Sequence, residues 1–165
     1  MPKHSDSPLW NRINRLLPRT QDPTLVLLKG HLLIEEQLFA IIGKHCRDAS
    51  PLEEARLTFV QKLRVAQAVS NSLSGQGFPL IQSLEKLNSV RNRMAHHAEI
   101  LDLDSRIDEY LRSWDPSGFV TPTTQHERTR YLRNTLIIHI GLLSGIGWKQ
   151  PTAKTETPIY FRRCR

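Results

Sequence analysis

Hydrophobic residues recur at helical spacing in the first long segment of the chain. Asp22 and Pro23 stand directly before it, and an aspartate cap followed by proline is typical of a helix start. Gly43 fits the final turn of such a helix. We therefore predict a long helix over residues 24–45, with polar Lys29, Glu35 and Glu36 and with apolar positions at Leu25, Leu28, Leu32, Leu38, Phe39, Ile41 and Ile42.

A second start signal stands at Ser50-Pro51-Leu52-Glu53. Serine as the cap, proline in the first helical position and glutamate three residues later form a capping box. The glycines of 74–77 then break the pattern. We predict one helix between these points, with a buried face made of Phe59, Val60, Leu63, Ala66, Val69 and Leu73.

The later part of the chain predicts three more helices. One begins near Pro79 and runs into the 87–97 segment, a shorter one covers 105–114, and the last runs from a capping box at Thr124 and Glu127 to Trp148. Residues 115–123 are rich in proline, serine, threonine and glycine and predict an irregular loop. Gly141 and Gly145 are four residues apart, which favours close packing inside one subunit, with a dimer seam as the alternative.

These elements predict an all-α fold, an antiparallel bundle of four to five helices over residues 1–148 with irregular N- and C-terminal tails. Residues 149–165 are expected to form a basic, flexible C-terminal tail. The 39% hydrophobic and 24% charged content is ordinary for a soluble protein, and no segment approaches the roughly 18 apolar residues that a membrane span needs. With no secretory signal in the first residues, we expect a cytoplasmic protein without a membrane partner.

The charge of the chain favours a polyanionic partner. Lys and Arg number 23 against 16 Asp and Glu, a formal net charge of +7, which attracts nucleic acid at long range. In the tail, Tyr160 and Phe161 beside Arg162, Arg163 and Arg165 could stack on bases and contact phosphates, although a frayed terminus is the more ordinary interpretation.

Arg91 occupies an unusual position on its predicted helix. At 100° per residue it falls between Leu84 and Leu87 on the apolar face, where a guanidinium needs a carboxylate, a phosphate or an interface cleft. Glu35 or Glu36 could neutralise it. His96 lies about 140° around the helix from Arg91. Either the helix distorts or ends near Ala95, or two copies related by a two-fold axis assemble one site.

Such a cleft could cleave RNA without a metal. An imidazole near its ordinary pKa can take the proton of a ribose 2′-hydroxyl or return one to the leaving oxygen, and a fixed arginine stabilises the charge on phosphorus. In this hypothesis Arg91 and His96 are catalytic, Asn92 orients them by hydrogen bonding, and Arg93 is a further phosphate contact.

The segment from Leu87 to His97 resembles the HEPN superfamily (higher eukaryotes and prokaryotes nucleotide-binding domains). Its ribonuclease members show Arg, often a polar residue next, and His after four to six residues, as in Arg91-Asn92-Arg93-Met94-Ala95-His96; His97 also falls within this spacing and is the alternative acid/base. The run from Lys29-Gly30-His31 to Glu35-Glu36 looks like the opening helix of some members. The resemblance implies a helical homodimer that cleaves RNA without metal or other cofactor in a toxin, antiviral or stress-response setting, with Lys29, Arg93 and His97 as RNA contacts.

The resemblance also implies a partner and leaves an alternative open. A cognate antitoxin or regulatory protein is expected. Some toxins of this kind have a modified tyrosine two residues after the histidine, where this chain has Ala98, so an antitoxin that modifies tyrosine is not expected. Many members have lost cleavage, and a non-catalytic RNA-binding or regulatory dimer is therefore the alternative function.

A metal-binding role for the histidines is less favoured, and a structural role is expected for His139. His96 and His97 could bind a metal together with His31, His45 or Glu99, but neighbouring residues on a helix diverge by 100°. His139, within Ile137-Ile138-His139-Ile140, is predicted to be a hydrogen-bonded core residue.

Overall fold

The computed structural model describes residues 8–70, 73, 79–96 and 101–145, and these residues form α-helices joined by turns and loops. The all-α prediction is confirmed. The described part contains seven helices rather than four or five: α1 (Pro8–Leu16), α2 (Pro23–His45), α3 (Ser50–Glu54), α4 (Phe59–Val69), α5 (Pro79–His96), α6 (Leu103–Trp114) and α7 (Gln125–Leu143). No helix within these ranges is long and apolar enough to cross a membrane.

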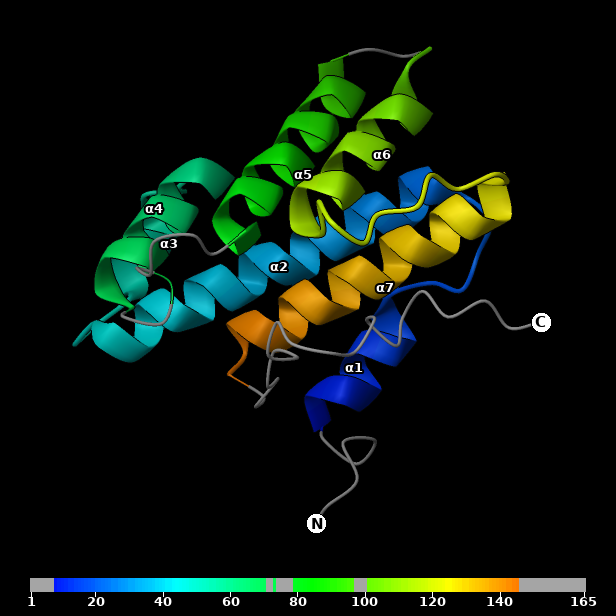
Figure 1. Cartoon of the computed structure of the whole chain (residues 1–165). Helices are drawn as coiled ribbons and strands as arrows, with labels where there is room; N and C mark the ends of the chain where they lie inside the picture. Colours follow the sequence, from blue (N-terminus) through cyan, green and yellow to red (C-terminus); the bar gives the residue numbers. More distant parts are fainter. Residues whose placement is uncertain (1–7, 71–72, 74–78, 97–100, 146–165) are drawn as a thin grey trace.

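Helices α2 and α7 lie side by side through the middle of the molecule, and α5 and α6 form a second pair (Figure 1). Ion pairs between Arg93 and Asp102 and between Lys86 and Glu109 show that α5 and α6 run antiparallel, as predicted.

Helices α2 and α7 run parallel, so the prediction of an antiparallel bundle is wrong for this pair. Gly30 faces Leu136, and near the start of both helices the Thr129 hydroxyl donates to the Gln21 carbonyl oxygen at 3.3 Å. The irregular residues 115–124 allow this arrangement, because they carry the chain from the end of α6 back to the end of the bundle where α2 begins (Figure 1).

Helix α2 starts as predicted. The Asp22 side chain accepts hydrogen bonds from the backbone N–H groups of Thr24 at 2.9 Å and Leu25 at 3.3 Å, and Pro23 occupies the first turn. The helix is enclosed on most of its circumference by α4, α5 and α7. Its apolar residues therefore surround the axis, and spacing alone does not separate the buried ones from the exposed Leu25, Leu28 and Leu32.

The capping box predicted at Ser50 and Glu53 is wrong. Ala49 precedes the short helix α3 without a side-chain cap, and Arg56 then turns the chain with a left-handed φ of 48°. The real capping box belongs to α4, where the Thr58 hydroxyl accepts from the Gln61 N–H and the Gln61 side chain accepts from the Thr58 N–H. The predicted single helix is thus two helices.

Three other boundaries also differ from the prediction. The N-terminal segment is not wholly irregular, because α1 forms there and buries Ile13 in the core. Helix α6 begins at Leu103, slightly early. Helix α7 keeps its predicted cap, with the Thr124 hydroxyl accepting from the Glu127 N–H, but it ends at Leu143, and Gly145 follows in a left-handed conformation with φ of 70°.

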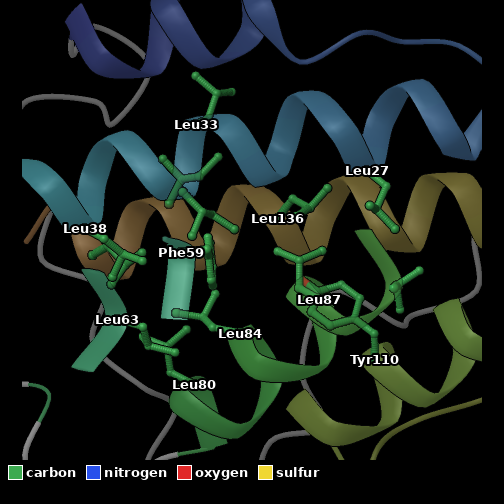
Figure 2. Close-up of a cluster of buried hydrophobic side chains, with 14 of the residues drawn as sticks. Leu27, Leu33, Leu38, Phe59, Leu63, Leu80, Leu84, Leu87, Tyr110 and Leu136 are labelled. Carbon is green, nitrogen blue, oxygen red and sulfur yellow. The ribbon is translucent and has the colours of Figure 1, made fainter. Parts of the chain in front are cut away.

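One hydrophobic cluster joins the helices. Its side chains come from α1, α2, α4, α5, α6 and α7. Figure 2 shows the labelled side chains of α4, α5 and α6 grouped on one side of α2, whereas Leu33 points to the other side of that helix. Those labelled in the figure are Leu27, Leu33, Leu38, Phe59, Leu63, Leu80, Leu84, Leu87, Tyr110 and Leu136. The cluster fixes the crossing of α5 over α2, which places the Arg91 turn of α5.

Gly30 is the glycine that permits close helix packing. A Cβ atom there would lie 2.9 Å from Leu136 Cγ and closer still to its methyl carbons. Around Gly141 and Gly145 a Cβ atom would meet no atom of the described residues within 4 Å, so the predicted tight packing of these two glycines inside one subunit is wrong for this part of the chain.

Candidate functional site

Arg91 lies where the apolar stripe of α5 leaves the core. Leu84 and Leu87 are fully buried and Val90 is buried, whereas Arg91 is half-buried and Ala95 is exposed. The position predicted from helical geometry is therefore confirmed. The guanidinium belongs to the inward face of the helix at the point where this face meets solvent.

Arg91 has no acidic partner in the part of the chain that the structure describes. No carboxylate of the described residues lies within 4.0 Å of its guanidinium, whose Nη1 donates only to Asn92 Oδ1 at 3.3 Å. The predicted neutralisation by Glu35 or Glu36 is wrong. Glu35 pairs with Lys62 at 2.8 Å, and Glu36 pairs with Arg12 at 2.6 Å.

His31 is buried beside this arginine. Its ring stacks on Phe59 with 4.3 Å between centroids, and its Nε2 shares a 3.2 Å hydrogen bond with Asn88 Oδ1, one turn before Arg91. Burial lowers the pKa of the His31 imidazole; the Asn88 bond and Glu35 oppose that change, and the positive charges of Arg91 and Lys62 reinforce it. A neutral imidazole therefore lies next to the Arg91 guanidinium.

The predicted site did not include His31 and Asn88 in these roles. The sequence pattern suggests His31 as a metal ligand or as part of the opening helix of the resemblance, and it assigns no role to Asn88. The sequence does contain a sign of the role of Asn88. This residue lies three positions before Arg91 on the same side of the helix, at the border of the apolar stripe. A polar residue in that position needs a buried partner.

His96 is the last residue of α5 and is exposed. The helix is continuous from Pro79 to His96, so no distortion separates Arg91 from His96, and it ends one residue after Ala95, close to the predicted end. With 1.5 Å of rise per residue, Arg91 and His96 are about 7.5 Å apart along the axis and about 140° apart around it. One copy of α5 does not direct both side chains to a single phosphate.

The remaining predicted RNA contacts are dispersed. Asn92 is exposed and touches Arg91, whereas Arg93 points to the other side of α5, where its Nε lies 3.8 Å from Asp102. Asp102 in turn binds Arg106 at 2.7 Å. Lys29 is exposed on α2. His97, Ala98, Glu99 and the predicted tail of 149–165 lie outside the described residues.

No group of three or more His, Cys, Asp or Glu side chains in the described ranges is arranged to hold a metal ion. His31 instead bonds Asn88, and His45 is exposed at the end of α2.

His139 is a hydrogen-bonded core residue, as predicted. Its Nδ1 lies 2.9 Å from the Tyr110 hydroxyl, and its ring meets Trp114 edge-on at 4.7 Å. Burial lowers the pKa of His139 to about 3 and raises the pKa of Tyr110. This pair joins α6 to α7.

Comparison of the chain with protein-family models, with curated proteins and with solved structures found no match in any of the three. The functional hypothesis therefore depends on the residues themselves.

Proposed function

We propose that this chain is a metal-independent endoribonuclease of the HEPN type, with Arg91 and His96 from two copies forming each active site. The observation that carries the proposal is the half-buried Arg91 without a carboxylate. Lys62, Arg106 and Arg128 are also partly covered, and each has one. Arg133 of α7 shares the lack of a carboxylate within the described residues and donates to the Asn14 amide oxygen at 3.2 Å. What distinguishes Arg91 is therefore the buried His31 beside it and the Arg-x4-His segment that it begins. An unpaired guanidinium next to a neutral histidine is suited to a phosphate.

The partial burial of Arg91 strengthens its interaction with an anion. Arg91 is only partly exposed, so the effective dielectric around it is lower than at a fully exposed arginine. Asn92 accepts from Nη1 and holds the planar group, leaving other N–H donors for phosphate oxygens. Charge that develops on phosphorus in the transition state is stabilised in the same way.

His96 supplies the proton transfer. Its imidazole takes the proton of a ribose 2′-hydroxyl, the 2′-oxygen attacks the adjacent phosphorus, and the bond to the 5′-oxygen breaks as that oxygen receives a proton. The products are a 2′,3′-cyclic phosphate and a free 5′-hydroxyl. Because the two residues diverge on α5, the His96 that acts beside Arg91 belongs to the second copy.

The first test is cleavage of an end-labelled RNA in EDTA. We expect wild type to cleave, Arg91→Ala and His96→Ala to lose at least about 100-fold of the rate, and His126→Ala, which removes an exposed histidine of α7, to cleave normally. A folded wild type that binds RNA without cutting it would overturn the enzyme and favour the non-catalytic binding dimer.

A mixing experiment tests the shared site. A heterodimer of Arg91→Ala with His96→Ala contains one site with both residues intact and one site with neither. Random exchange of subunits should therefore restore about a quarter of the wild-type rate. If two inactive variants with exchanged subunits stay inactive together, the two residues do not act across the dimer.

A further inference from the structure

Helix α2 has an exposed apolar stripe. Leu25, Leu28 and Leu32 are 40%, 38% and 52% exposed, and their spacing of three and four residues places them in one row. Lys29 and Glu36 lie on the same face, so the five residues occupy about 100° of the helix circumference. Helices α4, α5 and α7 cover other faces of α2, and α1 reaches the edge of this one, where Arg12 pairs with Glu36.

The concentration of leucine on this face distinguishes it from ordinary surface. The other large exposed apolar residues of the described part are single residues on separate segments, namely Val60, Leu101 and Val120. Scattered apolar residues need no explanation, whereas a contiguous row with charged residues beside it is typical of a protein interface.

We propose that a second copy of this chain packs on this stripe, with the two α2 helices antiparallel across a two-fold axis. The charges of the face are complementary in this orientation, and Leu25 and Leu28 then lie against the C-terminal half of the partner's α2. Pairing Lys29 with the partner's Glu36 puts the axis beside Leu32, so the two Leu32 side chains meet at the centre. Lys29 has no carboxylate within 4.0 Å among the described residues, and Glu36 already attracts one cation, Arg12.

The stripe borders the proposed catalytic arginine. His31 follows Leu28 by three residues, about 60° around α2, and its bond to Asn88 holds the Arg91 turn of α5 at this edge. A copy seated on the stripe therefore lies beside Arg91. This inference rests on the proposed shared site and names the surface on which the second copy packs. It gives Lys29 the role of a contact with that copy rather than with RNA.

Sedimentation velocity and light scattering test the interface. We expect wild type to have twice the 19.0 kDa mass of one chain. Leu32→Asp should raise the dimer dissociation constant at least about 30-fold, because it places two carboxylates at the centre of the interface. Val60→Asp is the matched control on α4, where it should leave the dimer unchanged.

Charge reversal supplies a second test that leaves the leucines in place. Lys29→Glu and Glu36→Lys should each weaken the dimer, because each sets like charges against one another, and the double variant should restore it. Arg12→Ala controls for the ion pair that Glu36 makes within its own chain and should leave the dimer intact.

A monomeric wild type, a Leu32→Asp variant that still dimerises, or a double variant that stays weak overturns this interface. These outcomes are independent of the cleavage assay, which reports on the proposed function. A monomeric, folded Leu32→Asp that cleaves RNA at the wild-type rate would leave the interface standing and overturn the shared active site.

Discussion

At the scale of single residues, Arg91 and Arg128 are both partly covered, but their charges have different surroundings. Arg128 of α7 donates to Asp108 of α6 at 2.9 and 3.2 Å, and the two side chains are only 13% and 11% exposed. Among the described residues, Arg91 has only the amide oxygen of Asn92. A charge that the fold covers without pairing stabilises the folded state little, and this is typical of a residue kept for a ligand.

Replacing each arginine by methionine tests this difference. Arg91→Met should change the free energy of unfolding in urea by less than about 1 kcal/mol, because no ion pair is lost. Arg128→Met should lower it by about 2 kcal/mol or more, because Asp108 then stays covered without its partner. The rate of RNA cleavage should respond in the opposite way: Arg91→Met should lose cleavage, and Arg128→Met should keep it. Equal destabilisation by both would make Arg91 a structural residue.

The lowered pKa of His139 predicts how the free energy of unfolding depends on pH. Its pKa is about 3 in the folded protein, below the value near 6.5 of an unfolded chain. Its stabilising contribution is therefore complete above pH 6.5 and is lost as the pH falls toward 3, by up to about 1.4 kcal/mol per pH unit. The lowered pKa of His31 acts in the same direction.

The measurement is urea unfolding of His139→Gln and wild type between pH 7 and 4.5. The variant lacks the titrating ring and should show the smaller decrease in the free energy of unfolding as the pH falls. His126→Gln, at an exposed histidine, should follow wild type. An unchanged slope in His139→Gln would contradict the assignment.

The candidate site was partly predictable at this scale. Helical geometry located Arg91 at the edge of the core and separated it from His96, because both inferences depend on positions along one helix. The partners of Arg91 were not predictable in this way. His31 and Asn88 are 57 residues apart in the sequence, and only the crossing of α5 over α2 brings them to 3.2 Å.

At the scale of elements, the contact between α2 and α7 depends on Gly30. Gly30→Ala should destabilise the protein by about 1–3 kcal/mol, because the new methyl group displaces the fully buried Leu136 in a packed core. Gly141→Ala on α7 is the matched control. A methyl group there meets nothing within 4 Å, and alanine should stabilise the helix by up to about 1 kcal/mol.

Thermal or urea unfolding of the two variants distinguishes these effects by their sign. If the stability of Gly30→Ala and of Gly141→Ala changed by the same amount, backbone flexibility, and not the close approach of α7, would determine the effect at residue 30.

Local sequence signals predict the presence of the helices better than the residues at which each helix begins and ends. Asp22 and Thr124 cap their helices as expected, because each acts within three residues of itself. Ser50 fails although its local pattern is good, since Arg56 turns the chain and Thr58 starts the next helix. The start at Thr58, eight residues after Ser50, emerges only from the structure.

At the scale of the whole molecule, the direction of α7 was beyond local patterns. Short connections favour antiparallel neighbours, and the return of residues 115–124 along the bundle makes α7 parallel to α2 instead. For a related reason, the spacing of the leucines on α2 does not show which of them are exposed. A helix enclosed by three others is apolar nearly all around, and the uncovered face depends on where those neighbours lie.

The net charge of +7 predicts a separation between binding and cleavage. Attraction to phosphates does not depend on the sugar, so RNA and its 2′-O-methyl counterpart should bind with similar affinity and weaken equally as salt rises, with a slope of about −0.7 per phosphate contact. Cleavage requires the free 2′-hydroxyl as the nucleophile. A single 2′-O-methyl group at the cleaved position should therefore abolish the cut there and leave the dissociation constant within about twofold, since only one oxygen of the strand changes. Gel-shift titrations and mapping of the labelled fragments measure both quantities. A cut that persists at the methylated position would mean that water, rather than the ribose, attacks the phosphorus, and the role given to His96 would then be wrong.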